Sequence, residues 1–278
     1  MNKKKFGSRG PLVSEIGMGT YYDIGWIILS RIGILRGAED KIKALKAGIE
    51  GGITLIDTAE IYGSEVLVRK AIEGYNREDL FIVSKVWSNH LRREALIKSL
   101  NNSLKRLNTN YLDLYLIHWP NRRVPINETI SAMEEMVDQG KIRYFGVSNF
   151  SLNELIEARQ ATKKYDITAV QINYSLLHRD PEKDIIPYCQ KEGIAIMAYY
   201  PLGHGRLVKE IEKLKPIMEK YKKTPAQIVL NWLASRDFVF PIPRASREVH
   251  VKENLGASGW KLADEDLDYL DKVFPKPS

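Results

Sequence analysis

The chain has 278 residues, 44% of them apolar and 28% charged, with a formal net charge of +7 and a pI near 9.2. This length suits an α/β barrel folded as a single unit. The basic charge could favour nucleic acid, an anionic membrane or an anionic small molecule. We favour the small molecule because the longest Lys/Arg block is Lys3-Lys4-Lys5, and a nucleotide cofactor with several phosphates would fit.

Several other classes of protein are excluded by simple features of the chain. Cys189 is the only cysteine, so an intrachain disulfide and a cysteine zinc cluster are impossible, and the five histidines lack zinc-ligand spacing. The first six residues contain no apolar segment typical of a secretory signal. The most apolar run, residues 24–35, is about a dozen residues long and contains Arg31, whereas a membrane span needs roughly 20. We therefore expect a cytoplasmic monomer with neither a nucleic-acid nor a membrane partner.

The first predicted element is a hairpin over residues 5–16, which turns at Ser8-Arg9-Gly10-Pro11 and could plug the bottom of a barrel. Eight apolar runs with strand character follow, and helical patterns separate them. The strands are predicted at residues 16–19, 54–57, 80–85, 112–118, 144–148, 169–173, 194–198 and 238–241. The helices are predicted at residues 39–50, 65–73, 93–107, 126–139, 152–164, 182–192 and 225–235. This alternation implies a parallel sheet, and eight strands close a (β/α)₈ TIM barrel, here one domain over residues 1–278.

Local signals support several of these helix ends. Ser151 and Thr224 are predicted N-caps, and Glu154 stands three residues after Ser151, as a capping box requires. Gly51-Gly52 and Gly140 are predicted C-terminal stops. Two segments interrupt the alternation: residues 23–37 are predicted to form a long first strand-to-helix loop, and residues 206–223 an extra helical segment. Both follow a strand, on the face where barrel active sites form.

Three strand candidates end in residues that can carry chemistry: Asp57, Lys85 and His118. Tyr62 follows Asp57 by one loop and can fold back over them. The carboxyl ends of neighbouring parallel strands lie on one face, so we expect the four side chains to meet there. Each alone is more often a cap, a surface group or a packing residue, and the interpretation depends on their convergence.

This set of side chains suits carbonyl reduction. Hydride addition builds negative charge on oxygen, and a phenol with an ordinary pKa of about 10 is protonated at neutral pH and can donate to it. We expect the Lys85 ammonium to bring the pKa of Tyr62 closer to neutrality and Asp57 to hold Lys85 charged. His118 Nε2–H could orient the substrate oxygen.

The motifs Asp57-Thr58-Ala59-Glu60-Ile61-Tyr62-Gly63, Lys85, His118-Trp119-Pro120 and Gly146-Val147-Ser148-Asn149-Phe150 resemble those of the aldo-keto reductase family. The likeness runs from Gly17 to about Leu255. It implies a (β/α)₈ barrel that binds NADPH, sometimes NADH, without a Rossmann domain. It also implies Tyr62 as the general acid, supported by Asp57, Lys85 and His118.

The resemblance assigns further positions to the cofactor. Thr20, Tyr21 and Asp57 resemble contacts near the first strands, and Ser148, Asn149 and Gln171 resemble the groups that bind the nicotinamide carboxamide. Tyr199 resembles the aromatic residue that stacks on the nicotinamide ring. The loop that wraps the pyrophosphate corresponds to Tyr200, Pro201, Leu202 and Gly203. The adenosine-phosphate segment corresponds to Pro243, Arg244, Ala245, Ser246, Arg247, His250, Glu253 and Asn254.

The adenosine-phosphate segment departs from the family pattern. Arg244 and Arg247 supply planar cations suited to a 2′-phosphate. Many members carry lysine and serine in place of Arg244-Ala245, and arginine in place of His250. We therefore expect NADP, with NAD left possible.

Aromatic residues directly follow two of the catalytic candidates. Trp87 and Trp119, with His118, could bind the substrate, and core packing is the alternative for both tryptophans. A final helix is predicted at residues 264–273, and the chain given ends five residues later. Long family members carry a substrate-covering loop there, so we expect an open pocket with broad aldehyde tolerance.

From the sequence we expect a chain that reduces aldehydes and ketones to alcohols by hydride transfer from NAD(P)H, with a tyrosine as the general acid. One alternative is a redox-sensing, cofactor-bound binding module of the same fold with little turnover. A weaker alternative is a barrel isomerase or lyase acting on sugar phosphates.

Overall fold

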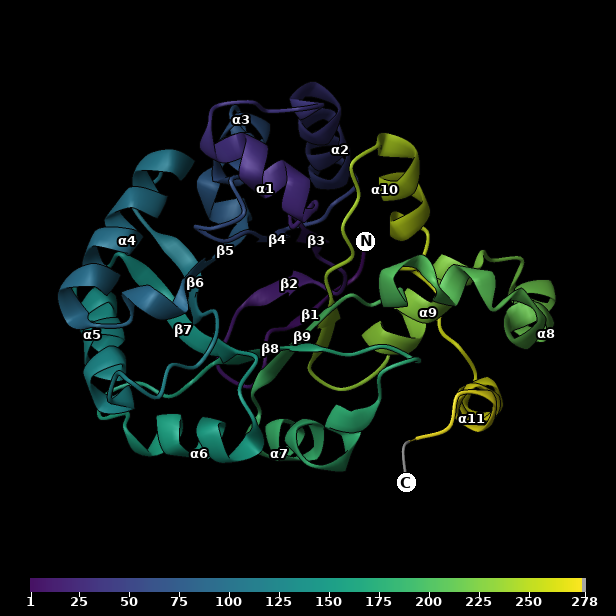
Figure 1. Ribbon diagram of the computed structural model, residues 1–278. Helices are drawn as coiled ribbons and strands as arrows, with labels where there is room; N and C mark the ends of the chain where they lie inside the picture. Colours follow the sequence, from purple (N-terminus) through teal and green to yellow (C-terminus); the bar gives the residue numbers. More distant parts are fainter. Residues whose placement is uncertain (277–278) are drawn as a thin grey trace.

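The computed structural model describes residues 1–276, and within this range eight parallel strands pair in the sequential order β3 to β10. They curl around a common centre with helices outside them (Figure 1). The strands are β3 (Met18–Gly19), β4 (Leu55–Asp57), β5 (Phe81–Val86), β6 (Leu112–Ile117), β7 (Ile142–Ser148), β8 (Ala169–Asn173), β9 (Ala195–Tyr199) and β10 (Val239–Pro241). The Gly17 N–H donates to Pro241 O at 2.9 Å and the Gly19 N–H to Pro243 O at 3.1 Å, which joins the last strand to the first. The predicted (β/α)₈ barrel is confirmed.

The alternation of side chains along the strands builds two apolar layers. Successive residues of a strand point to opposite faces, so every second residue faces the barrel interior. The interior cluster contains Leu55, Phe81, Val83, Leu114 and Leu116, and their intervening neighbours belong to the larger cluster under the helices. Two residues further along β4, β5 and β6, the inner face carries the predicted polar residues Asp57, Lys85 and His118. The same periodicity that fills the barrel therefore places polar groups above its apolar floor.

The predicted hairpin closes the other end of the barrel. β1 (Lys3–Lys5) and β2 (Leu12–Ser14) pair antiparallel, so the hairpin begins slightly before its predicted start. The fully buried Phe6 packs with its ring centroid 4.8 Å from Phe81 and 4.9 Å from Phe240. Lys4 Nζ donates to the backbone oxygens of Ala234 at 2.8 Å and of Val239. The prediction of a plug is confirmed.

The helices occupy most of the predicted places. They are α1 (Ile24–Arg31), α2 (Ala38–Glu50), α3 (Glu65–Ile72), α4 (Arg93–Leu107), α5 (Ile126–Asp138), α6 (Leu152–Gln160), α7 (Ile185–Glu192), α8 (Ile211–Tyr221), α9 (Pro225–Ala234), α10 (Glu248–Leu255) and α11 (Asp264–Val273). Ser151 and Thr224 both form complete capping boxes, with Glu154 and Gln227 as their reciprocal partners. The extra helical segment is present as α8, and the final helix matches α11.

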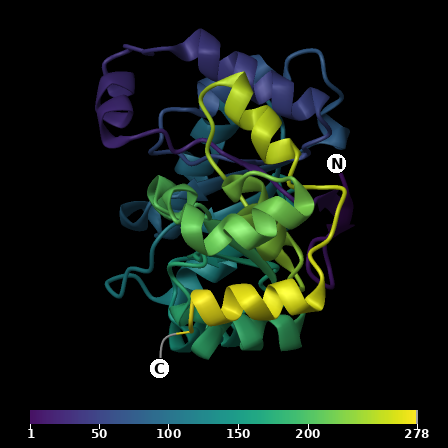
Figure 2. The same ribbon diagram turned by 90° about the vertical axis from the view of Figure 1, so that its right-hand side faces the viewer.

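Two helices depart from the sequence prediction. Residues 23–37 were expected to be a loop, and this is wrong because α1 forms within them. Asp23 caps α1 by accepting the Trp26 N–H at 2.7 Å, and Trp26 is buried. Figure 2 shows α1, in purple at the upper left, projecting from the body of the molecule. α10, after the last strand, also lacks a predicted counterpart, because its charged sequence has little helical periodicity.

None of the helices in residues 1–276 combines the length and the apolar content needed to span a lipid bilayer.

Candidate active site

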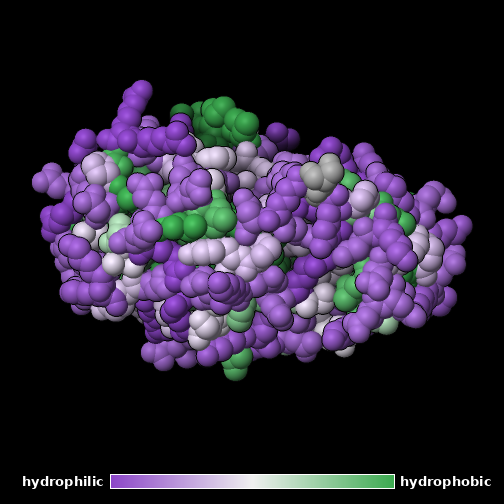
Figure 3. Space-filling view, turned by 90° about the horizontal axis from the view of Figure 1, so that it is seen from below, coloured by the Kyte–Doolittle hydropathy of each residue, from purple (hydrophilic) through white to green (hydrophobic). Residues whose placement is uncertain are grey.

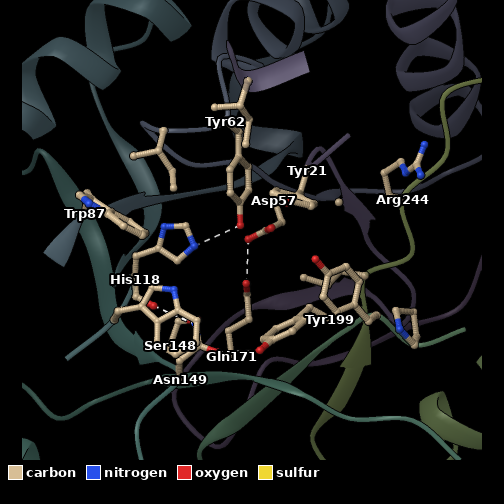
Figure 4. Close-up of a pocket in the computed structure, with 17 residues that line it drawn as sticks. Tyr21, Asp57, Tyr62, Trp87, His118, Ser148, Asn149, Gln171, Tyr199 and Arg244 are labelled. Carbon is tan, nitrogen blue, oxygen red and sulfur yellow. Dashed lines mark hydrogen bonds between the residues drawn. The ribbon is translucent and has the colours of Figure 1, made fainter. Parts of the chain in front are cut away.

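A cavity of about 360 Å³ opens at the carboxyl ends of the barrel strands. Asp57 lies two residues beyond Leu55, Lys85 two beyond Val83, and His118 two beyond Leu116, so all three side chains continue the inner face. The residues that line the cavity are Gly19, Tyr21, Ile27, Asp57, Ile61, Tyr62, Trp87, His118, Trp119, Ser148, Asn149, Gln171, Tyr199, Tyr200, Pro201, Ile242 and Arg244. Figure 4 shows Tyr62, Asp57 and His118 pointing toward one another inside it.

Asp57 and Lys85 form a buried ion pair at the floor of the cavity. Lys85 Nζ donates to Asp57 Oδ2 at 2.8 Å and to Thr58 O at 2.9 Å, and the Lys85 side chain is fully buried. Gln171 Nε2 donates to the other carboxylate oxygen of Asp57 at 2.8 Å. Burial raises the pKa of Asp57 and lowers the pKa of Lys85, and in each case the partner's charge opposes the effect of burial. The pair holds Lys85 Nζ in a fixed position.

Tyr62 lies above this pair. Its hydroxyl is 3.4 Å from Lys85 Nζ and 3.2 Å from His118 Nε2, and its side chain is buried. Trp26 of α1 holds the loop from behind, because its Nε1–H donates to Tyr62 O at 3.0 Å. Burial, and then the negative charge of Asp57, raise the pKa of Tyr62 well above its ordinary value. The net direction is opposite to the one expected from Lys85, because burial is the largest cause, and the phenol stays protonated at neutral pH.

His118 is a neutral imidazole in this site. Burial, and then the nearby Lys85 charge, lower the pKa of His118 to about 2. Its Nε2 faces the Tyr62 hydroxyl, while its buried Nδ1 has no hydrogen-bond partner among residues 1–276. The Trp87 ring stands edge-on to it at a centroid distance of 5.3 Å. Because the ring does not take up a charge at neutral pH, it can act as a hydrogen-bond donor to a substrate oxygen but not as a cation.

A chain of hydrogen bonds links His118 to the predicted nicotinamide end. Asn149 Nδ2 donates to His118 O at 2.9 Å and to Ser148 Oγ at 3.0 Å, and Asn149 Oδ1 accepts from the Tyr199 hydroxyl at 2.7 Å. Asn149 has a φ of 62°, a left-handed conformation that asparagine tolerates better than most residues. These contacts fix the aromatic face of Tyr199 against the cavity.

The opposite end of the cavity is basic. Arg244 lines it, at the right of Figure 4, and pairs as an isolated parallel bridge with Gly19. Arg247 Nη2 and His250 Nε2 lie 2.9 Å apart on the exposed start of α10. Since Arg247 is donor only, His250 Nε2 is the acceptor of this bond. The donor set therefore fits a dinucleotide: amide and hydroxyl groups and an aromatic face at one end, and planar cations at the other.

The predicted site residues separate into two groups. All four catalytic candidates converge, although Lys85 lies beneath the cavity surface, and the substrate candidates Trp87, His118 and Trp119 line the cavity. Of the cofactor candidates, the cavity is lined by Tyr21, Asp57, Ser148, Asn149, Gln171, Tyr199, Tyr200, Pro201 and Arg244. The remaining candidates lie outside this lining: Thr20, Leu202, Gly203, Pro243, Ala245, Ser246, Arg247, His250, Glu253 and Asn254. Thr20 is fully buried, and its hydroxyl donates to Asp57 O at 2.9 Å, so it supports the end of β4.

Further contacts around the site were missed from the sequence. Glu60 Oε1 accepts the Trp87 N–H and lies 3.0 Å from His90 Nδ1, which ties the loop that carries Tyr62 to the end of β5. The position of Glu60 between Asp57 and Tyr62 in the motif was the one feature of the sequence that could have indicated its role. The bond from Trp26 to Tyr62 had no such feature, because it depends on α1.

Comparison with known proteins agrees with this geometry. The model of the "Aldo/keto reductase family" matches residues 16–274. Methylglyoxal reductase YeaE of Escherichia coli is 38% identical over 94% of this chain and 91% of its own length. The glyoxal reductase of Bacillus subtilis is 36% identical over 92% of this chain and 93% of its own length.

Solved structures are also similar. A thermostable aldo-keto reductase in complex with the inhibitor epalrestat has a TM-score of 0.89 and 42% identity, covering 98% of this chain and 100% of that one. An aldo-keto reductase from Klebsiella pneumoniae in complex with NADPH has a TM-score of 0.89 and 33% identity, covering 100% and 96%. With an eight-stranded barrel in residues 1–276, a tyrosine, lysine, aspartate and histidine at its mouth and these likenesses over nearly its whole length, the chain belongs to the aldo/keto reductase family.

Proposed function

We propose that this protein reduces aldehydes and ketones to alcohols with NADPH, using Tyr62 as the general acid. The observation that carries the proposal is the position of the Tyr62 hydroxyl, 3.4 Å from Lys85 Nζ and 3.2 Å from His118 Nε2 at the floor of the cavity. The names of two relatives, a methylglyoxal reductase and a glyoxal reductase, support small carbonyl compounds as substrates.

The positions of Tyr62, His118 and Lys85 suggest how a proton would reach the substrate. A carbonyl oxygen between Tyr62 and His118 would accept hydrogen bonds from both side chains, which polarises the carbonyl carbon. A reduced nicotinamide, when bound, supplies the hydride. As the oxygen gains negative charge, the Tyr62 proton passes to it and the alcohol forms. Lys85 then faces a phenolate, and its ammonium, held by Asp57, stabilises that charge until solvent restores the proton.

The cofactor end supports NADPH as the preferred hydride source. Ser148, Asn149 and Gln171 would bind the carboxamide, and Tyr199 would cover one ring face. Arg244 and Arg247 would hold the phosphate of the adenosine half. The complex of a structural neighbour with NADPH supports the same choice. Titration with NADPH and with NADH should give the lower dissociation constant for NADPH.

The experiment that tests the proposal is Tyr62→Phe. We expect at least about a thousandfold loss of aldehyde-dependent absorbance change at 340 nm, with NADPH binding retained, because general acid catalysis contributes on this scale. Tyr22→Phe is a matched control, since Tyr22 is also buried, its hydroxyl has no hydrogen-bond partner in the described part of the chain, and it lies outside the cavity lining. Near wild-type turnover of Tyr62→Phe would remove Tyr62 as the acid. Wild-type protein that binds NADPH but reduces no aldehyde would favour the redox-sensing alternative.

A further inference from the structure

α1 carries an unusual run of exposed isoleucines. On the helix Ile24 is 67% exposed and Ile28 58%, and just beyond its end Ile32 is 69% and Ile34 50% exposed. Figure 3 shows a strongly hydrophobic group protruding at the upper edge of the molecule, where Figures 1 and 2 place α1. Single exposed apolar residues need no explanation, but a contiguous group that projects into solvent indicates a binding surface.

This surface is continuous with the cavity. Ile27 lines the cavity and is only partly exposed. Residues three and four apart on a helix are neighbours, so Ile24 lies beside both Ile27 and Ile28. We call these three residues the α1 ridge. The apolar wall of the cavity therefore extends outward along the ridge without a polar break between Ile27 and Ile24.

The ridge is held rigidly at the mouth of the cavity. Asp23 caps the helix at Trp26, and Trp26 Nε1–H donates to Tyr62 O at 3.0 Å. Gly63, at φ 70°, passes so close to α1 that an added Cβ would lie 2.0 Å from Ser30 Oγ. One side of α1 is thus packed against the loop that carries the proposed acid, and the other side presents the isoleucines.

The apolar and charged residues of the cavity lining indicate which kind of substrate tail can reach the ridge. The lining of the cavity includes the apolar side chains of Ile27, Ile61, Trp87, Trp119 and Ile242. Among the described lining residues, the charged side chains are Asp57, paired with Lys85, and Arg244 at the opposite end. The cation beside Tyr62, Lys85, is buried and paired with Asp57, so among the described lining residues at this end no cation is left for a carboxylate or phosphate on the tail of a carbonyl compound, whereas a hydrocarbon tail finds apolar surface.

The ridge is too small to be a protein interface of standard size. Such interfaces bury roughly 800 Å² per partner and use at least about 20 residues a side. α1 and the turn after it together offer four strongly exposed isoleucines. Its size and its continuity with the cavity fit the tail of a small substrate.

We propose that the α1 ridge binds the apolar tail of the substrate, and that the substrates are carbonyl compounds whose hydrocarbon chain extends beyond the cavity. This inference rests on the proposed carbonyl reductase function. Full burial of one methylene is worth about fourfold in binding, and one-sided contact with a ridge about half of that free energy, or about twofold. The kcat/KM of unbranched aldehydes should then rise about twofold per methylene, or about thirtyfold from propanal to octanal.

The test compares this chain-length series in three proteins: wild type, the double variant Ile24→Ser with Ile28→Ser, and Ile211→Ser. Ile211 is a matched control, because it is 47% exposed on α8 and lies outside the cavity lining. We expect the double variant to keep the wild-type kcat/KM for propanal and to lose at least fivefold for octanal. The control should retain the wild-type slope.

Three results have distinct meanings. If kcat/KM rises equally with chain length in wild type and in the double variant, the ridge does not bind the tail, while the proposed reductase function is unaffected. No reduction of propanal or octanal by wild type would instead contradict the proposed function itself. If the slope is unchanged but the double variant alters sedimentation or loses binding to anionic phospholipid vesicles, the exposed isoleucines serve a second copy or a membrane surface, and the inference is wrong.

Discussion

The buried pair of Asp57 and Lys85 allows a quantitative test by a double-mutant cycle. The variants are Asp57→Asn, Lys85→Met and the two combined. Each single substitution leaves one member of the pair unpaired where the side chains of Asp57 and Lys85 are 4% and 0% exposed. Removing one partner of a buried ion pair costs about 3–5 kcal/mol, because the remaining charge must be neutralised or stay without a counter-charge.

The double variant should lose much less than the sum of the two single losses. It removes both charges, but it leaves Gln171 Nε2 and Thr58 O with weakened or missing partners, at about 1–3 kcal/mol for a buried group without its bond. From singles of about 4 kcal/mol each and a double of about 4 kcal/mol, the coupling free energy is about 4 kcal/mol.

Urea unfolding followed by far-ultraviolet circular dichroism measures the four free energies of unfolding without any need for activity. The m-values should agree among the four proteins, so that the differences report stability. A coupling below about 1 kcal/mol would refute the reasoning, since that is the range of solvent-exposed ion pairs. Additive losses would show that each side chain acts through other contacts.

Two further predictions concern the barrel floor and the imidazole. Phe6→Ala should lower the free energy of unfolding by about 3–5 kcal/mol in urea titrations, because Phe6 is fully buried against Phe81 and Phe240. A loss below about 1 kcal/mol would mean that the hairpin does not plug the barrel in solution. Since burial lowers the pKa of His118 to about 2, the folded protein binds fewer protons than the unfolded chain below about pH 6.5. The contribution of His118 to the free energy of unfolding is therefore complete above about pH 6.5 and declines as the pH falls. The variant His118→Gln should lack this part of the pH dependence of stability.

The barrel could be predicted from the sequence because its strands are short apolar runs separated by amphipathic helices. The strands could be recognised as continuous apolar runs without an alternation of polar and apolar residues. The turn and capping residues marked the helix ends. α1 could not be predicted in the same way. Its sequence, Ile24 to Arg31, is apolar on almost all sides, so it has no polar face to reveal the helix. Its helical state depends on the Asp23 cap and on the packing of Trp26.

The convergence of Asp57, Tyr62, Lys85 and His118 was predictable, since parallel strands bring their carboxyl ends together. The direction of the pKa of Tyr62 was not. Sequence reasoning counted the attraction of Lys85 and had no measure of burial, which raises the pKa of Tyr62. The supporting contacts of Gln171 and Thr20 with Asp57 join distant parts of the chain, and only the fold could reveal them.

The plug also has a consequence for how the chain matures during synthesis. Lys4 and Phe6 are made before the rest of the barrel, yet their partners Val239 and Phe240 come more than 230 residues later. At roughly 5–20 residues per second, the ribosome needs on the order of ten to fifty seconds to make the interval between them. During that time the hairpin lacks the last strand against which it packs, and Phe6 stays available to chaperones or to other nascent chains. Final closure of the core must therefore wait for the last strand, which makes the N-terminal segment a natural place to detect late folding by pulsed protease cleavage.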